Sequence, residues 1–127
     1  MTAKPAGAVA SRLQGAWRYV GTTHDGKWRE DRGDNPLGII IYDPSGHMAA
    51  QVVPVREQRA TAPISRFLAY FGTYSIDEGA STVTHHREGD LRPDGEADAV
   101  RQYRFEGDRL ILSPVDSTQD IIWERIK

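Results

Sequence analysis

The chain consists of short stretches rich in Val, Ile, Tyr, Trp and Thr, separated by turn signals about every ten residues. These residue types favour strands, and several stretches alternate apolar and polar positions with the period of two that a half-buried strand requires. The turn signals combine Asp and Gly, some with Pro, at residues 25–26, 43–46, 77–80, 92–95 and 107–108. This regular spacing predicts an antiparallel all-β sandwich or barrel.

Eight strands follow from the pattern, at residues 16–23, 37–42, 47–53, 71–77, 81–90, 98–106, 109–115 and 119–126. Eight antiparallel strands in chain order suffice to close an up-and-down barrel, and closure removes the exposed sheet edges. We also predict one helical turn within residues 9–13, and a rim helix over residues 64–70, where apolar positions recur at helical spacing. The domain prediction is therefore a flexible tail with a short helix at 1–12 and a β-barrel domain at 13–127.

The hairpin around residues 107–108 indicates which side chains of its strands face inward. A two-residue loop places Phe105 opposite Leu110 and Tyr103 opposite Leu112 on one apolar face. Arg101 falls on the same face, two residues beyond Tyr103. A guanidinium keeps its proton, so its burial demands an oxygen partner, and no Asp or Glu shares this inferred face nearby. A ligand oxygen or an ordered water is the expected partner.

The hairpin around residues 77–81 places polar residues inside as well. If Ile76 opposes Val83, then Tyr74 opposes His85 on the inward face, while His86 lies on the polar outer face and is solvated. The polar interior group predicted along three neighbouring strands is Tyr74, His85, Arg101 and Tyr103.

The turn at residues 43–46 leaves two alternatives open. A four-residue loop opposes Tyr42 with His47 and Ile41 with Met48. The favoured alternative points an apolar set inward: Ile39, Ile41, Met48, Ala50 and Val52. The other places a more polar set inside the barrel: Ile40, Tyr42, His47, Ala49 and Gln51.

Length, charge and composition exclude several function classes. The chain has 127 residues, enough for one domain, and its formal net charge of −2 argues against a nucleic-acid partner. The absence of cysteine excludes a disulfide framework, a thiolate metal site and a cysteine nucleophile. No apolar run reaches the ~18–20 residues of a membrane span, and the N-terminus lacks the apolar core of a signal peptide. We therefore expect a soluble cytoplasmic protein without a membrane partner.

The remaining chemistry depends on histidine, tyrosine and arginine. His85 and His86 are adjacent on a strand and point to opposite faces, so they cannot bind one metal ion together. The sequence contains neither a Gly-x-Ser-x-Gly elbow nor a glycine-rich phosphate loop, and nothing in it is specific for haem. We expect neither a metal nor a cofactor.

Several sequence strings resemble a known family. Residues 13–18 resemble the Gly-x-Trp signature that opens the first strand of lipocalins, and Arg125 is placed like the lipocalin arginine that packs over that tryptophan. Four further strings look like the bacterial and fungal lipocalin-like domain family, at residues 41–48, 70–74, 82–86 and 107–110. The likeness runs from about Leu13 to Arg125 in matching order. It implies an eight-to-ten-stranded barrel with an interior pocket, but no single activity, because such barrels host carriers and several kinds of enzyme.

The first functional hypothesis is a cofactor-independent isomerase, lyase or cyclase acting on a small oxygenated hydrophobic molecule, polyketide- or terpenoid-like, in secondary metabolism. Its catalytic residues are His85 as general acid or base, Arg101 as oxyanion or carboxylate anchor, and Tyr74 as hydrogen-bonding wall. The predicted ligand-binding residues are Ile41, Tyr42, Met48, Tyr70, Tyr103, Phe105 and Trp123.

Two alternatives stay open beside the enzyme. One is a non-catalytic lipocalin-like carrier that binds a small hydrophobic molecule with the same residues. The other is a barrel with a filled interior that acts through its surface, for instance as a homodimer.

Overall fold

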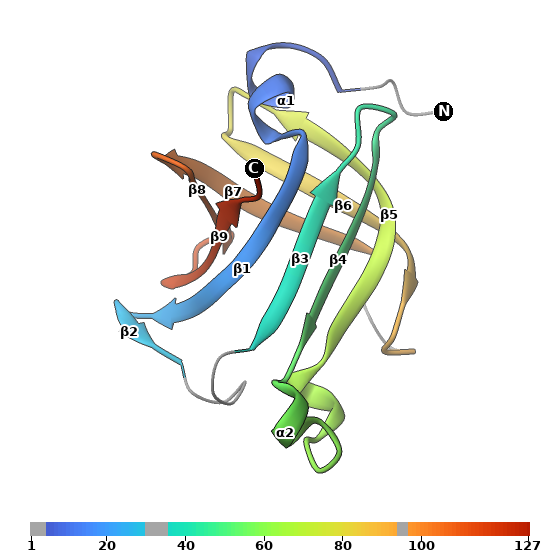
Figure 1. The fold of residues 1–127 in the computed structure, drawn as a ribbon. Coiled ribbons are helices and arrows are strands. Elements are labelled where there is room, and N and C mark those ends of the chain that lie inside the picture. Colours follow the sequence, from blue (N-terminus) through green and yellow to red (C-terminus); the bar gives the residue numbers. More distant parts are fainter. Residues whose placement is uncertain (1–4, 30–35, 94–96) are drawn as a thin grey trace.

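The structure, a computed structural model, describes residues 5–29, 36–93 and 97–127. Within these residues nine strands follow one another in a single antiparallel sheet (Figure 1). They are β1 (Gly15–His24), β2 (Lys27–Trp28), β3 (Leu37–Tyr42), β4 (His47–Val53), β5 (Leu68–Asp77), β6 (Thr82–Asp90), β7 (Asp98–Glu106), β8 (Arg109–Pro114) and β9 (Gln119–Arg125).

The sheet closes on itself because β1 pairs with both β3 and β9. The eight strands β1 and β3–β9 therefore form a closed antiparallel barrel, and β2 adds a short extra strand at the end of β1, where Thr23 pairs with Trp28. The predicted fold class is confirmed. The strand boundaries also agree with the sequence pattern, apart from the start of β5 and the added β2.

Three short helical segments accompany the barrel: α1 (Ala8–Leu13), α2 (Arg56–Arg59) and the 3₁₀ helix η1 (Ile64–Arg66). Figure 1 shows α1 at one end of the barrel and α2 at the opposite end. The helical turn predicted within residues 9–13 is confirmed. The rim helix predicted over residues 64–70 is wrong, because only a 3₁₀ turn forms and Leu68 already begins β5. The backbone of this segment pairs with β4 instead, with Leu68 opposite Val52, so ladder hydrogen bonds override the helical spacing.

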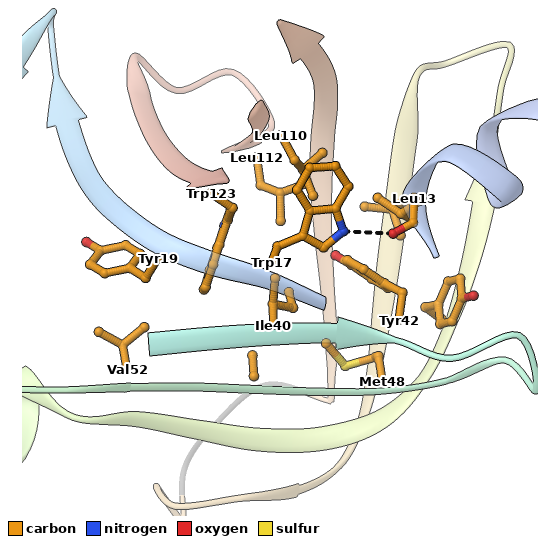
Figure 2. Close-up of a cluster of buried hydrophobic side chains, with 13 residues drawn as sticks. Leu13, Trp17, Tyr19, Ile40, Tyr42, Met48, Val52, Leu110, Leu112 and Trp123 are labelled. Carbon is orange, nitrogen blue, oxygen red and sulfur yellow. Dashed lines mark hydrogen bonds between the residues drawn. The ribbon is translucent and has the colours of Figure 1, made fainter. Parts of the chain in front are cut away.

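The barrel end next to α1 is closed by Trp17, the first tryptophan of the chain. Its indole Nε1 donates to the carbonyl of Leu13 at 2.8 Å, which ties α1 to the start of β1 (Figure 2). The guanidinium of Arg125 lies 4.0 Å from the Trp17 ring centroid and donates to the carbonyl of Gln14 at 2.9 Å. The cation–π closure implied by the lipocalin resemblance is present.

Both hairpin registers read from the turns are confirmed. Tyr103 pairs with Leu112 on β8, and Tyr74 pairs with His85 on β6. On β7, Arg101 pairs with the buried Val83 and shares its inward face.

Both alternatives assumed that Tyr42 lies opposite His47. In the structure Tyr42 pairs with Met48, so the register of the β3–β4 hairpin is shifted by one residue. The amide of Gly46 donates to the carbonyl of Asp43 at 3.0 Å, and the amide of Asp43 donates to the carbonyl of His47 at 2.9 Å. Gly46 takes φ +92°, so the connection is a tight turn with an additional left-handed glycine, and Tyr42 pairs with Met48.

This shift mixes the two predicted inward sets. The side chains buried from these strands are Ile40, Tyr42, Met48, Ala50 and Val52. The favoured alternative was wrong for β3, since Ile41 is 40 % exposed on the outside. The other was wrong for β4, since His47, Ala49 and Gln51 point outward. Tyr42 therefore enters the interior together with the apolar face of β4.

Apolar and aromatic side chains from seven strands and α1 form the buried core (Figure 2). Its members are Leu13, Trp17, Tyr19, Ile40, Tyr42, Met48, Ala50, Val52, Tyr74, Val83, Leu110, Leu112 and Trp123. No helix in the described residues has both the length and the apolar character needed to span a membrane.

Candidate functional site

An internal cavity of about 40 Å³ lies among the inward side chains of the barrel. This volume accommodates roughly three water molecules. Most of the lining is apolar, with a few polar groups in between. The lining residues are Tyr19, Thr22, Ile40, Ala50, Val52, Leu68, Tyr70, His85, Arg101, Leu112, Ile121 and Trp123.

His85 lies at the wall of this cavity and is held on both ring nitrogens. Its Nε2 lies 2.5 Å from the hydroxyl oxygen of Tyr42, and its Nδ1 lies 2.8 Å from the hydroxyl oxygen of Tyr70. The three side chains come from β6, β3 and β5, so the barrel brings together residues far apart in the sequence. His85 itself is 1 % exposed.

Burial keeps this trio neutral. Desolvation, followed by the positive charges of Arg101 and Arg87, lowers the pKa of His85 to about 3. Desolvation also raises the pKa of Tyr42 well above its usual value, and it raises the pKa of Tyr70. At neutral pH the trio is one imidazole and two phenols.

A neutral imidazole donates from one nitrogen and accepts at the other. The hydroxyl of Tyr42 is fully buried, and His85 is its one hydrogen-bond partner in the described residues. If Tyr42 accepted from His85, its own O–H would lie buried without an acceptor, which is costly. Tyr42 therefore donates to Nε2, and Nδ1 donates to the oxygen of Tyr70. The O–H of Tyr70 is left to donate to another acceptor at the cavity.

Arg101 is half-buried and is the one residue of the cavity lining that carries a charge at neutral pH. Its Nη1 donates to the backbone carbonyl of Val100 at 3.1 Å in an exposed contact, so the guanidinium lies between the cavity and the surface. Within the described part of the chain, no carboxylate forms an ion pair with this guanidinium. The prediction that Arg101 points inward without an acidic partner agrees with this geometry.

A second arginine borders the same region but has an acidic partner. Arg87 pairs with Asp90 at 3.1 Å, and its guanidinium lies 5.4 Å from the Tyr70 ring centroid. The pair has no net formal charge, although its cation contributes to the lowered pKa of His85.

Two further polar groups lie on the β1–β9 side of the cavity. The hydroxyl oxygens of Tyr19 and Thr22 are 2.5 Å apart, so one of the two donates to the other. The indole Nε1 of Trp123 is buried and has no hydrogen-bond partner among the described residues. Trp123 lines the cavity, while its indole nitrogen itself has almost no accessible surface.

The predicted site residues divide into two groups in space. His85, Arg101, Tyr70 and Trp123 line the cavity, and Tyr42 supports His85 from behind. Five other predicted residues do not line it: Tyr74, Ile41, Met48, Tyr103 and Phe105. The hydroxyl of Tyr74 donates to the carbonyl of Asp43 at 2.9 Å, next to the β3–β4 turn, instead of contacting His85.

The other predicted residues that do not line the cavity pack against other side chains or lie on the surface. They are Phe105, Tyr103, Met48 and Ile41. Phe105 packs between the guanidinium of Arg12, 4.3 Å from its ring centroid, and the ring of Trp17. The ring of Tyr103 lies tilted against that of Phe105, with ring centroids 5.8 Å apart. Met48 belongs to the buried core, and the exposed Ile41 cannot contact an interior ligand at all.

Eight cavity residues were not among the predicted site residues, namely Tyr19, Thr22, Ile40, Ala50, Val52, Leu68, Leu112 and Ile121. Of these, Ala50, Val52 and Leu112 were expected to face inward. The alternation Trp17–Tyr19 on the first strand would have indicated Tyr19. Thr22 carries no such signal, because the register of β1 against β9 shifts between Tyr19 and Gly21 and turns Thr22 inward.

His86 lies on the outer face, as predicted, but it is ordered there. Its Nε2 lies 2.8 Å from the hydroxyl of Ser75, and its Nδ1 lies 3.1 Å from a carboxylate oxygen of Asp98. No cluster of three or more His, Cys, Asp or Glu residues in the described ranges is placed to hold a metal ion.

A second hollow of about 410 Å³ lies on the outer face of β4, β5 and β6. Its apolar lining includes the outward side chains of Ala49, Phe71 and Leu91, with Phe71 56 % exposed. No Lys or Arg belongs to its lining in the described residues. This outer hollow is larger than the interior cavity, but no cationic side chain of the described residues points into it.

The comparisons with known proteins agree with this closed barrel. The profile of a lipocalin-like domain family matches residues 14–125, nearly the whole chain. The chain belongs to the lipocalin-like domain family.

A solved structure shares this lipocalin-like fold. The crystal structure of a DUF4847 family protein from Bacteroides vulgatus aligns with a TM-score of 0.61 over 94 % of this chain and 99 % of that chain. Its sequence is 13 % identical, so the likeness concerns the fold alone. No curated protein sequence matches the chain. The lipocalin-like barrel itself suggests the binding of a small hydrophobic ligand.

Proposed function

We propose that this barrel binds one small, largely apolar molecule in its interior and places an oxygen of that molecule against Arg101. The observation that supports this most is the guanidinium of Arg101, which lines a largely apolar cavity without a carboxylate partner in the described residues. A charge in such a place is costly unless an oxygen compensates it. A ligand oxygen supplies that compensation, while the surrounding aliphatic side chains hold the apolar part.

The small size of the cavity limits the ligand. A volume of about 40 Å³ fits a head group and a few carbon atoms, and a larger molecule must extend past the lining side chains. Leu68 is half-buried and lies two residues after the end of the short η1 segment, at the start of β5. We propose that this side chain moves when a longer apolar chain enters.

The test fills the cavity and leaves the rest of the surface unchanged. Ala50 is 1 % exposed and lines the cavity, whereas its neighbour Ala49 points outward into the outer hollow. Butyrate and 2-butanone are titrated into the protein while the indole N–H signals of the three tryptophans are followed by NMR. We expect saturable shifts at Trp123 in the unaltered chain and in Ala49→Leu, and their loss in Ala50→Leu. Unchanged binding in Ala50→Leu, or loss only in Ala49→Leu, would overturn interior binding.

A second candidate is catalysis without a cofactor, as an isomerase, lyase or cyclase of a polyketide- or terpenoid-like molecule. The observation that favours it is the hydrogen-bonded chain Tyr42–His85–Tyr70, which ends at the cavity wall beside Arg101. In this proposal the O–H of Tyr70 and the guanidinium of Arg101 stabilise negative charge that develops on a substrate oxygen. His85 positions Tyr70, because a histidine with a pKa of about 3 is a weak base at neutral pH.

Turnover measured against binding separates the two candidates. Tyr70→Phe removes the proposed donor and retains the ring. If a candidate substrate binds this variant within about threefold of the unaltered chain but its conversion is lost, the carrier alone is excluded. If every small oxygenated molecule that binds is recovered unchanged, the enzyme is excluded and the carrier remains.

A further inference from the structure

We infer that the ligand of this cavity is a small apolar monocarboxylate, whose carboxylate group is held by Arg101 and Tyr70. This inference rests on the proposed interior binding and specifies the chemical class of the ligand. It follows from three independent properties of the cavity: its net charge, its hydrogen-bonding polarity and its size.

The net charge of the cavity calls for one negative charge. Arg101 is the one charged residue in the described lining, and the neighbouring Arg87 is balanced by Asp90 at 3.1 Å. His85 is neutral because both of its ring nitrogens are engaged by phenols in a buried setting. A monoanion therefore balances the interior, whereas a phosphate dianion would leave one buried negative charge without a partner and an alcohol or ketone would leave Arg101 uncompensated.

Apart from the hydroxyls of Tyr19 and Thr22, which pair with each other, the hydrogen-bonding groups that remain on the Tyr70–Arg101 side of the cavity are donors. Tyr70 has an O–H to give, because its oxygen already accepts from Nδ1 of His85. Arg101 uses one N–H on the carbonyl of Val100 and retains the others. The buried Nε1–H of Trp123 also lacks an acceptor in the described residues, but it has almost no accessible surface, so the two available donors are Tyr70 and Arg101. A group that accepts several hydrogen bonds and donates none matches this set, and a carboxylate is such a group.

The size and lining of the cavity define the rest of the ligand. A planar carboxylate matches the fork of a guanidinium and needs only three non-hydrogen atoms, so it fits within about 40 Å³. Beyond it the lining is aliphatic, with Ile40, Leu112 and Ile121. An unbranched or small branched carbon chain fills this part better than a sugar or another polar skeleton, which would bury unpaired hydroxyl groups.

The test compares head groups on one carbon chain. Butyrate, butyramide, 1-butanol and butyl phosphate are titrated into the full chain at neutral pH, with dissociation constants from calorimetry and NMR. We expect butyrate to bind at least tenfold more tightly than each of the other three. Acetate, hexanoate and octanoate then report how far the aliphatic part contributes.

Substitutions of two arginines on β7 test which side chain causes the preference for a carboxylate. Arg101→Met keeps most of the side-chain volume and removes the charge, and Arg101→Lys keeps the charge but not the fork. We expect the preference for butyrate over butyramide to vanish in Arg101→Met and to fall several-fold in Arg101→Lys. The control is Arg104→Met, which alters an arginine on the outer face of the same strand, where it pairs with Glu106 and Asp120. This control is expected to retain the preference, and melting curves establish that each variant is folded.

The outcomes separate this inference from the proposed function. If butyramide or 1-butanol binds as tightly as butyrate and Ala50→Leu abolishes the binding, the interior site stands and the carboxylate assignment is wrong. If butyl phosphate binds most tightly, the charge argument is wrong. If none of the four binds, both proposals fail. A preference for butyrate that survives Arg101→Met would show that another group reads the carboxylate and overturns the inference.

Discussion

The hydroxyl oxygen of Tyr42 lies 2.5 Å from Nε2 of His85 inside the barrel, although 43 residues separate them in the sequence. Their strands do not neighbour each other in the sheet, so the bond crosses the interior. It determines the tautomer of the imidazole and therefore the donor that Tyr70 presents to the cavity. The chemistry proposed for this barrel depends on that one contact.

Tyr42→Phe tests this contact. The variant keeps the ring and leaves Nε2 of His85 buried without a donor, so we expect a loss of about 1–3 kcal/mol in the free energy of unfolding. Urea unfolding measures it. In the double variant Tyr42→Phe with His85→Leu both polar partners are absent, and the two losses should not add. Strictly additive losses, or a loss under about 0.5 kcal/mol for Tyr42→Phe, would show that the bond contributes little.

The low pKa of His85 predicts a pH dependence of stability. In the unfolded chain a histidine titrates near 6.5, whereas folding lowers the pKa of His85 to about 3. Between these values the unfolded chain binds the additional proton, so the folded state loses stability as the pH falls from 6.5 towards 3. The contribution of His85 reaches about 1.4 kcal/mol per pH unit within this window.

The measurement is the free energy of unfolding of three proteins between pH 7 and pH 4. His85→Gln removes the titrating group, and its stability should fall less steeply than that of the unaltered chain. His86→Gln removes a histidine of the outer face and should keep the steep slope. Equal slopes for His85→Gln and the unaltered chain would contradict a neutral, buried His85.

Arg101→Met is expected to stabilise the ligand-free protein. The guanidinium of Arg101 is half-buried without a carboxylate partner in the described residues, and methionine fills similar space without a charge. We expect a gain on the order of 1 kcal/mol in thermal unfolding. Arg104→Met removes two exposed ion pairs and should cost between 0 and about 1 kcal/mol. A clear loss of stability in Arg101→Met would indicate that this arginine supports the fold instead of awaiting a ligand.

The turn that directs Tyr42 inward depends on Gly46. Its φ of +92° is strained for any residue with a Cβ atom, so Gly46→Ala should cost about 1 kcal/mol or more. Gly79 lies in another hairpin turn and its φ is not in the left-handed range, so Gly79→Ala should change stability by less than about 0.5 kcal/mol. Equal costs for the two variants would contradict the assigned role of the Gly46 turn.

The parts of the fold that were predictable from sequence are those set by local turn chemistry. The two-residue loop after Glu106 and the turn after Asp77 specify their registers, and these place Arg101 and His85 inside. The Gly-x-Trp signature and Arg125 likewise indicated the closed end of the barrel.

The parts that failed depend on single additional residues or on distant neighbours. One left-handed glycine in the β3–β4 turn shifts Tyr42 inward and Ile41 outward, and a shift in β1 turns Thr22 inward. The partner of His85 could not be inferred from its opposite residue on β5, because Tyr74 bonds to Asp43 while Tyr42 reaches across from β3. Contacts across a barrel interior follow from closure and shear, which a local pattern does not encode.

A crystal structure of the protein grown with butyrate tests the central claim most directly. The account predicts density in the interior cavity, with a carboxylate at about 2.8 Å from the guanidinium of Arg101 and from the hydroxyl of Tyr70. The carbon chain should lie against Leu112 and Ile121. An empty cavity, with butyrate only in the outer hollow beside Phe71 or nowhere on the protein, would contradict it.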